Sequence, residues 1–375
     1  MEQGNKVNII TIHFGTNHGS VLQAYALSHY LQGIGYDAKI IDYVPERYKI
    51  WNNLLLRKKG KYPLPVIMAY YPFAVLKNYR VRKLFDNFLK HNLNLTKRYS
   101  TKEELKNSPP VADIYVTGSD QVWNNDYNGD NEYSYFLDFI PENSKKVAYA
   151  ASFGKENMPE EQLQKISHLL QDFGAISVRE ADAKRILETI DIRATHVTDP
   201  VFLFSREEWR EFASKKKTEK SYILVYVMDG LYTELLDYAQ KLKEHTGKKI
   251  YVVSFRKIDD PRIDKCFYLA SPKDFVALID NADAVVTNSF HGTAFSVIFQ
   301  KNFITIGKEK YNSRMQSLLD KLGLNSHFIP TGANYEIGDI QKALEQTDTE
   351  QVEKILREWI EESKMYIQSA MKTGE

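Results

Sequence analysis

Residues 284–292 have the sequence AVVTNSFHG, an apolar run that ends in a polar turn. A short run rich in β-branched residues and followed by turn residues favours a buried strand. In α/β proteins, ligands bind at the edge of the sheet where the parallel strands end. This segment therefore predicts a strand that carries His291 to a ligand-binding edge.

Two other segments repeat this construction. GTNHGS at residues 15–20 follows the apolar run 7–12, and GSDQVWN at residues 118–124 follows the apolar run 111–117. Strands of one parallel sheet end at the same edge. We therefore expect the three polar turns to converge on a single site.

The order of elements at the N-terminus indicates an α/β fold. The run 7–12 is followed by a helical pattern over 20–32, with Ser20 as its expected N-cap, and then by a strand over 38–44. A strand, a helix and a second strand in this order are typical of the opening of a Rossmann-like domain with a parallel sheet.

The same pattern restarts after a break at Asp199-Pro200, with a strand predicted over 222–228. A chain of 375 residues suits two domains better than one. We predict two Rossmann-like domains that face each other across a cleft, followed by a C-terminal helix that packs back on the first domain. The expected ranges are 1–200, 201–347 and 348–375.

Composition limits the function classes. The formal net charge is +1, so nucleic acid is not indicated as a partner. The single cysteine, Cys266, allows no intramolecular disulfide and fits a reducing compartment. No run of about 18 apolar residues occurs, and the first residues fit a strand better than a signal peptide. We expect a cytoplasmic protein.

Residues 45–98 carry a strong excess of positive charge. They hold thirteen Lys or Arg and two acids, so the segment is +11 and the rest of the chain about −10. Large apolar residues are interleaved with the basic ones, as in elements that lie on the anionic inner face of a membrane. Ordinary helices with a solvated basic face give the same pattern. Pro63, Pro65 and Pro72 are expected to break the segment into pieces.

Sequence patterns for several kinds of site are absent. C-x-x-C, H-E-x-x-H, Walker A and G-x-S-x-G do not occur, and GTNHGS lacks the G-x-G-x-x-G spacing of dinucleotide sites. We therefore expect no metal site and no dinucleotide site.

Three segments carry a family resemblance. GTNHGSVLQAYAL, VTGSDQVWN and NSFHGTAFSVIF resemble the polysaccharide pyruvyl transferase family. Weaker landmarks are Arg179-Glu180, Thr198-Asp199-Pro200 and Arg314, and the likeness runs from about residue 8 to about residue 325. The family pattern more often has an aromatic residue at the position of His18.

The resemblance implies a glycosyltransferase-B-like architecture and a specific reaction. Phosphoenolpyruvate donates its pyruvyl group to two hydroxyls of a sugar in a cell-surface polysaccharide, such as a capsule or exopolysaccharide, or in its lipid-linked precursor. A cyclic ketal forms and phosphate is released. This chemistry requires no metal or redox cofactor, so none is expected beyond phosphoenolpyruvate as co-substrate. The first domain is expected to bind the acceptor and the second the donor.

His291 and Asp120 are the expected catalytic residues. An imidazole gives or accepts a proton near neutral pH, and a carboxylate can orient or deprotonate an acceptor hydroxyl. The structural alternatives are that His291 satisfies the hydrogen bonds of a turn and that Asp120 forms an Asx turn or a helix N-cap.

Cationic and hydroxyl side chains are expected to bind the donor anions. A guanidinium can grip a carboxylate or a phosphate with two hydrogen bonds. Lys310 competes with Lys308 for this role, and an ion pair to Glu180 or Asp182 is the structural alternative for Arg179. The expected donor-binding residues are Arg179, Ser289, Lys308 and Arg314.

Amide and indole groups are expected to bind the acceptor. Amides bind hydroxyls, and an indole face packs on a pyranose ring. Trp123 is equally consistent with a core position. The expected acceptor-binding residues are Asn17, Gln121, Trp123 and Asn124.

Two other functions fit the same architecture. A nucleotide-sugar-dependent glycosyltransferase requires an acidic residue that binds the ribose near the end of a strand in the second domain, and Asp229 has that position. A catalytically silent sugar-binding protein requires no such residue.

Overall fold

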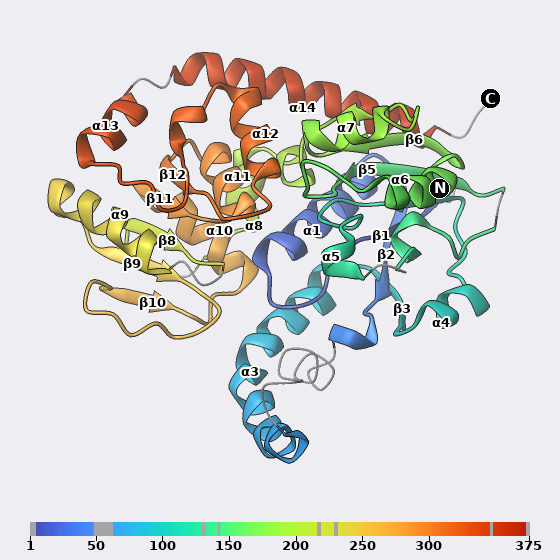
Figure 1. The fold of residues 1–375 in the computed structure, drawn as a ribbon, viewed down its shortest axis with the longest axis horizontal. Helices are drawn as coiled ribbons and strands as arrows, with labels where there is room; N and C mark the ends of the chain where they lie inside the picture. The colour runs from blue at the N-terminus through green and yellow to red at the C-terminus, as the bar shows by residue number, and fades with distance from the viewer. Residues whose placement is uncertain are drawn as a thin grey trace.

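Seven parallel strands form the first sheet of the protein (Figure 1). The computed structural model describes residues 5–48, 63–129, 132–141, 143–215, 219–228, 232–345 and 348–372. The strand order is β3-β2-β1-β4-β5-β6-β7. The strands are β1 (Lys6–Ile10), β2 (Asp37–Tyr43), β3 (Leu95–Tyr99), β4 (Ile114–Thr117), β5 (Lys145–Ala151), β6 (Phe173–Val178) and β7 (Thr195–His196).

Six parallel strands form the second sheet, in the order β10-β9-β8-β11-β12-β13. The change from one sheet to the other lies between residues 196 and 223. The strands are β8 (Ile223–Tyr226), β9 (Ile250–Val253), β10 (Lys265–Phe267), β11 (Ala284–Thr287), β12 (Asn302–Ile306) and β13 (Phe328–Ile329).

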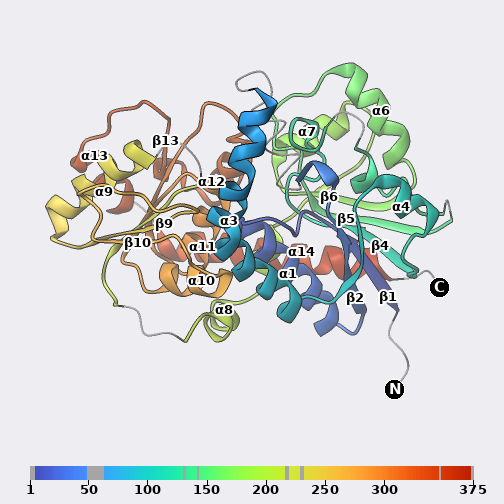
Figure 2. The same ribbon diagram turned by 90° about the horizontal axis from the view of Figure 1, so that it is seen from below.

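Helices connect the strands and cover both sheets (Figures 1 and 2). In the first domain they are α1 (His18–Gly33), α3 (Leu64–Asn92), α4 (Lys102–Asn107), α5 (Asn125–Asn128), α6 (Glu160–Leu170) and α7 (Ala181–Glu188). After the first sheet come α8 (Arg206–Phe212), α9 (Tyr232–Thr246), α10 (Pro272–Asp280), α11 (Phe290–Ile298), α12 (Ser313–Leu322), α13 (Ile337–Glu345) and α14 (Thr349–Met371).

Each sheet has one point at which the strand order reverses. In the first sheet β1 lies between β2 and β4, and in the second β8 lies between β9 and β11. The two helices that follow the central strands then cover opposite faces, which leaves a crevice at the carboxyl ends of those strands. The prediction of two Rossmann-like domains is confirmed.

Helix α14 returns from the second domain to the first, as expected (Figure 1). Near its start, Glu353 pairs with Arg206 at 3.5 Å. Further along, the Ser363 hydroxyl accepts a hydrogen bond from the Thr198 amide at 2.9 Å, and the Tyr366 hydroxyl donates to the Ala148 carbonyl at 3.4 Å.

Several local predictions were wrong. The N-cap of α1 is Asn17 rather than Ser20, because the Asn17 carboxamide accepts from the amides of Gly19 and Ser20. Helix α11 begins at Phe290, so His291 lies in its first turn and not in the preceding loop. Residues 64–92 form one helix, although Pro72 lies inside it. Pro65 sits in the first turn, where no backbone donor is needed.

No helix in the described ranges has the length and hydropathy needed to cross a bilayer.

His18 joins the two domains. Its ring stacks on Phe255 and Phe275 of the second domain, with centroids 5.2 and 4.8 Å away. Nε2 lies 3.0 Å from the carbonyl of Ala270, and Nδ1 lies 3.3 Å from the hydroxyl of Tyr226. Burial lowers the pKa of His18 to about 4, so the ring is neutral at physiological pH.

The two domains also come into close contact at Gly19, the residue after His18, which lies against the ring of His291. A Cβ atom built on Gly19 would lie 1.9 Å from Nδ1 of His291. Any side chain at this position must therefore displace the imidazole. Helix α1 can approach α11 this closely because Gly19 has no side chain. The backbone of Gly19 has no conformation that would itself require glycine.

We predict that His18 makes the protein less stable in mild acid. In the unfolded chain a histidine has a pKa near 6.5, so the unfolded state binds the extra proton first as pH falls from about 6.5 to 4. The loss is on the order of 3 kcal/mol across that range. His18→Phe keeps the ring stacking and removes the titration, so urea unfolding at a series of pH values should show a shallower decline.

His196 supplies an internal reference for this experiment. Burial also lowers its pKa to about 4, so its share of the decline should persist in the variant. At about pH 8, His18→Phe should cost about 1 kcal/mol, because the Ala270 carbonyl loses its donor. An unchanged pH dependence in the variant would contradict a neutral, buried His18.

A second prediction concerns Gly19. Gly19→Ala should lower the free energy of unfolding by about 1–3 kcal/mol, since the new methyl group overlaps the His291 ring. Gly33→Ala is the matched control, because it lies in the same helix with nothing within 4 Å of its built Cβ. The control should be neutral or stabilising by up to about 1 kcal/mol. Equal effects in urea unfolding would contradict the contact.

Candidate active site

One pocket lies where the reversal points of the two sheets meet. Its volume is about 270 Å³. Residues that follow β1, β2 and β4 line it from the first domain, and residues that follow β8, β11 and β12 line it from the second. The lining consists of Ile12, Asn17, Ser20, Tyr48, Asp120, Gln121, Tyr127, Met228, Asn288, Ser289, Phe290, His291, Lys308, Tyr311, Arg314 and Met315.

Three helices begin at this pocket. The cap or first turn of α1, of α11 and of α12 contributes to the lining. A helix N-terminus presents unpaired backbone N–H groups and the positive end of the helix dipole. At α1 and α11 some of these amides already bond the cap side chains of Asn17 and Ser289, so the three ends contribute chiefly the positive ends of helix dipoles, which favour an anionic ligand.

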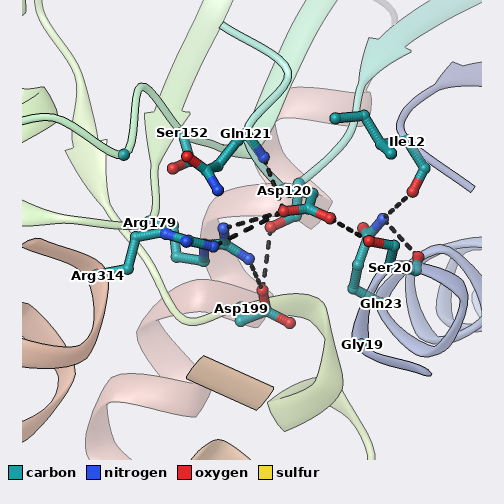
Figure 3. Close-up of polar contacts among 12 residues, drawn as sticks. Ile12, Gly19, Ser20, Gln23, Asp120, Gln121, Ser152, Arg179, Asp199 and Arg314 are labelled. Atoms are coloured by element: carbon teal, nitrogen blue, oxygen red, sulfur yellow. Dashed lines mark hydrogen bonds and ion pairs between the residues drawn. The ribbon is translucent and has the colours of Figure 1, made fainter. Parts of the chain in front are cut away.

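Asp120 lies at the centre of a polar network beneath this pocket (Figure 3). Its backbone is held at φ 75°, which is unusual for a residue other than glycine. The Ser20 hydroxyl donates to Oδ2 at 2.6 Å, and the Gln121 amide donates to Oδ1 at 2.8 Å. Arg179 Nη2 and Arg314 Nη1 lie 3.6 and 3.8 Å from Oδ1.

The network keeps Asp120 ionised. Burial by itself raises the pKa of a carboxyl group, but the positive charges of Arg179, His291 and Arg314 outweigh burial here. The pKa of Asp120 is therefore below its usual value.

A second buried carboxylate, Asp199, connects the two domains. Its Oδ2 accepts from Arg179 Nη1 at 2.5 Å and from the Ser119 hydroxyl at 3.1 Å. His291 Nε2 of the second domain lies 3.7 Å from the same oxygen. Burial raises the pKa of Asp199, but the ion pair with Arg179 and the nearby His291 outweigh it and hold the pKa far below the usual range.

Several buried nitrogens at this site have no hydrogen-bond partner. They are Nε and Nη2 of Arg179, Nε of Arg314 and Nε2 of His291. The Phe290 ring lies near both guanidinium groups, 4.5 Å from Cζ of Arg179 and 6.0 Å from Cζ of Arg314. Buried donors without acceptors are rare in proteins, so these nitrogens leave unused hydrogen-bonding capacity at the site.

Glu180 is a third carboxyl group in this network. Its Oε1 accepts from the Ser152 hydroxyl and the Gly154 amide, both at 2.9 Å, and its Oε2 has no partner. Burial raises the pKa of Glu180, and Arg179 and Arg314 offset only part of that rise. It contrasts with Asp120 and Asp199, whose pKa values are lowered.

Three tyrosines line the pocket next to this network of charged residues. The Tyr48 hydroxyl donates to the Tyr127 carbonyl at 3.1 Å, and the rings of Tyr127 and Tyr311 lie 5.5 Å apart. Tyr311 belongs to the second domain, and its hydroxyl donates to Asp126 of the first at 2.7 Å. Tyr127 is 49% exposed.

Most of the residues selected from the sequence come together here. The pocket lining includes all but three of them. Arg179 lies behind Asp120, within hydrogen-bonding distance of Asp199, and not with Glu180 or Asp182 as the structural alternative proposed. Those in the lining are Asn17, Asp120, Gln121, Ser289, His291, Lys308 and Arg314.

Trp123 and Asn124 lie outside this pocket. Trp123 is 2% exposed, and its ring stacks on Phe136 at 5.3 Å and also contacts Phe153. The indole is therefore packed among core aromatic rings, although Trp123 and Asn124 also line a separate pocket of about 280 Å³. The Asn124 side chain caps α5 by accepting from the Asp126 amide.

Sequence reasoning did not select Asp199, which lies in the network behind the pocket, or the three tyrosines that line the pocket. Asp199 was assigned to a domain boundary, although an aspartate directly before a proline and shortly after a strand is also a signal for a functional turn. Tyr48, Tyr127 and Tyr311 have no such signal, because they come from loops and a short helix far apart in sequence. No cluster of His, Cys, Asp or Glu that could hold a metal ion occurs in the described part of the chain.

Two solved structures share the arrangement of both domains. The UDP-N-acetylglucosamine 2-epimerase from Rickettsia bellii has a TM-score of 0.51 at 12% identity, with 98% of each chain covered. The UDP-GlcNAc 2-epimerase from Neisseria meningitidis, bound to UDP-GlcNAc, has a TM-score of 0.50 at 13% identity, covering 98% of this chain and 100% of that one. These likenesses concern the fold alone and confirm the glycosyltransferase-B-like architecture.

No protein of curated function has a significant match to this chain. The family model described as polysaccharide pyruvyl transferase matches residues 17–308, which is most of the chain. The matched range contains Asp120, Arg179, Asp199 and His291. The chain therefore belongs to the polysaccharide pyruvyl transferase family.

Proposed function

We propose that the protein transfers the pyruvyl group of phosphoenolpyruvate to a sugar of a cell-surface polysaccharide or of its lipid-linked precursor. The product is a cyclic ketal, and phosphate is released. The observation that carries this proposal is the convergence of three helix N-termini and Arg314 on one pocket, with the buried Arg179 behind Asp120. The family of the chain supports the same reaction.

The donor carries a phosphate and a carboxylate on adjacent carbons, so it needs two anion sites close together. The first turns of α11 and α12, with Ser289, Lys308 and Arg314, form the half of the pocket that belongs to the second domain. The unpartnered Nε of Arg314 is available to one of these anions. Arg179 supplies positive charge from behind Asp120.

The acceptor binds the half of the pocket that belongs to the first domain. Asn17 and Gln121 offer amide groups to sugar hydroxyls, and the exposed ring of Tyr127 offers a face for the pyranose. This assignment moves the aromatic contact from Trp123 to Tyr127. Asp120 lies between the two halves, and its carboxylate accepts a hydrogen bond from the backbone amide of Gln121.

The reaction begins with transfer of a proton to the methylene carbon of phosphoenolpyruvate. The neighbouring carbon becomes electron-poor, and a sugar hydroxyl adds to it with loss of a proton. The C–O bond to phosphate then breaks, and a second hydroxyl adds at the same carbon with loss of its proton. One of the two hydroxyl protons replaces the proton used on carbon, and the other leaves with the solution or the phosphate.

His291 and Asp120 have the positions that these steps require. His291 gives the proton to carbon, and Asp199 at 3.7 Å stabilises the imidazolium before transfer. Asp120 remains a carboxylate because its pKa is lowered, so it orients an acceptor hydroxyl and accepts its proton as the new C–O bond forms.

Calorimetric titration with phosphoenolpyruvate tests the donor assignment. The wild-type protein should bind it, and Arg314→Lys should weaken binding about tenfold, because an ammonium group cannot form the two-point contact of a guanidinium. Lys310→Gln is the control, since Lys310 is exposed and lies outside the lining. Equal affinity in Arg314→Lys and the wild type would contradict the site.

Asp120→Asn separates binding from turnover. Removal of a negative charge beside an anion site should leave phosphoenolpyruvate binding unchanged or tighter. Phosphate release in the presence of hexose and hexosamine acceptors should fall by about a hundredfold or more, because the base is lost.

Binding of nucleotide sugars gives the contrary outcome. Heat on titration with UDP-N-acetylglucosamine and none with phosphoenolpyruvate would favour a nucleotide-sugar-dependent glycosyltransferase. Asp229, the candidate ribose ligand for that function, lies outside the described residues.

A further inference from the structure

The first half of α3 is unusually apolar at its surface. Residues 64–76 contain no charged side chain. Phe73 and Leu76 are 69% and 73% exposed. The large apolar side chains of α3 that are exposed are Leu64, Val66, Met68, Tyr70, Phe73, Leu76 and Tyr79, which are seven of the ten such side chains in the described part of the chain.

These side chains lie on an element that projects from the body of the protein. Figure 1 shows the beginning of α3 extending beyond both domains. The second half of the helix is anchored, because Val81, Phe85, Phe88 and Leu89 are buried in the core. In the first half Ile67 is 2% exposed, so one side of that half is covered and its other sides carry the exposed apolar residues.

The exposed apolar residues surround most of the helix. At about 100° per residue, the directions from Leu64 to Tyr79 cover an arc of about 240°. A partner helix would cover a narrower stripe. Lipid acyl chains can surround a projecting helix and contact apolar side chains on many sides. A lipid monolayer therefore fits this broad apolar surface better than a single partner helix does.

Positive charge follows the apolar tip. Arg80, Lys83 and Lys90 are exposed in the second half of α3, against one exposed acid, Asp86. In the sequence, Arg57-Lys58-Lys59-Gly60-Lys61 precedes the helix, so basic residues flank the apolar stretch on both sides. Cations at this position complement anionic lipid headgroups.

We propose that residues 64–79 of α3 insert into the surface of an anionic membrane, with Arg80 and Lys83 at the level of the lipid phosphates. The proposed attachment is interfacial and does not span the bilayer.

The same helix leads to the cleft. The Phe85 ring lies 5.1 Å from the ring of His18, and His18 starts the helix α1 whose first residues line the pocket. Tyr48 of the pocket precedes the segment that leads to α3. Attachment through α3 therefore brings the cleft to the membrane surface, which suits a lipid-linked acceptor; this step rests on the proposed function.

Co-sedimentation with vesicles tests the attachment without any substrate. The wild-type protein should pellet with vesicles of phosphatidylglycerol and phosphatidylcholine, and about tenfold less with phosphatidylcholine alone or in about 1 M salt. This comparison requires no variant. Equal binding to both kinds of vesicle, or none to either, would overturn the proposal.

Paired variants locate the contact. Phe73→Glu with Leu76→Glu should reduce vesicle binding by about tenfold or more, whereas Val111→Glu with Met365→Glu should not, although these control side chains are 84% and 61% exposed. Arg80→Glu with Lys83→Glu should reduce binding to the anionic vesicles, and Lys354→Glu with Arg357→Glu on α14 should not. Circular dichroism checks that each variant is folded.

Light scattering distinguishes a second copy of the chain from lipid. A wild-type dimer that Phe73→Glu with Leu76→Glu converts to a monomer, in a protein that does not bind vesicles, would overturn the membrane proposal. Vesicle binding in a protein that fails to bind phosphoenolpyruvate would leave the attachment standing and remove only its link to the proposed reaction.

Discussion

The ion pair between Arg179 and Asp199 is the interaction on which the site depends. Both side chains are buried, and the pair lies between the end of the first sheet and the start of the second domain. Removal of one partner of a buried pair leaves an uncompensated charge and typically costs about 3–5 kcal/mol. Arg179 also lowers the pKa of Asp120, as it does that of Asp199. The position of this one guanidinium group therefore affects both the geometry of the site and the charge of its carboxylates.

The location of the site could be predicted from sequence because it follows from strand direction. Three apolar runs that end in polar turns identify strands β1, β4 and β11, and parallel strands deliver those turns to one edge. Asp120 and His291 were found in this way. The pairing of Arg179 with Asp199 could not be found, because it depends on how the linker crosses the end of the first sheet.

Trp123 and α3 show two other limits of sequence reasoning. A tryptophan beside polar turn residues suits a sugar site or a core equally well, and only the rings of Phe136 and Phe153 decide between them. Three prolines predicted breaks within residues 45–98, yet residues 64–92 form one helix with Pro72 inside it, and only Pro63 marks a boundary there. Its second half is fixed by buried contacts with the core, and tertiary packing of this kind outweighs local propensity.

Helix α14 has a mechanical consequence for the cleft. The chain passes from the first domain to the second near residue 200 and returns along α14, which contacts Arg206 at one end and Ala148 near the other. The two domains are thus connected twice, and one of the connections is a long helix. Two connections restrict the relative motion of the domains more than a single hinge does. Both connections lie on one side of the molecule, so this side of the cleft is held closed by the chain itself and the opposite side is the one that a separation of the domains would open.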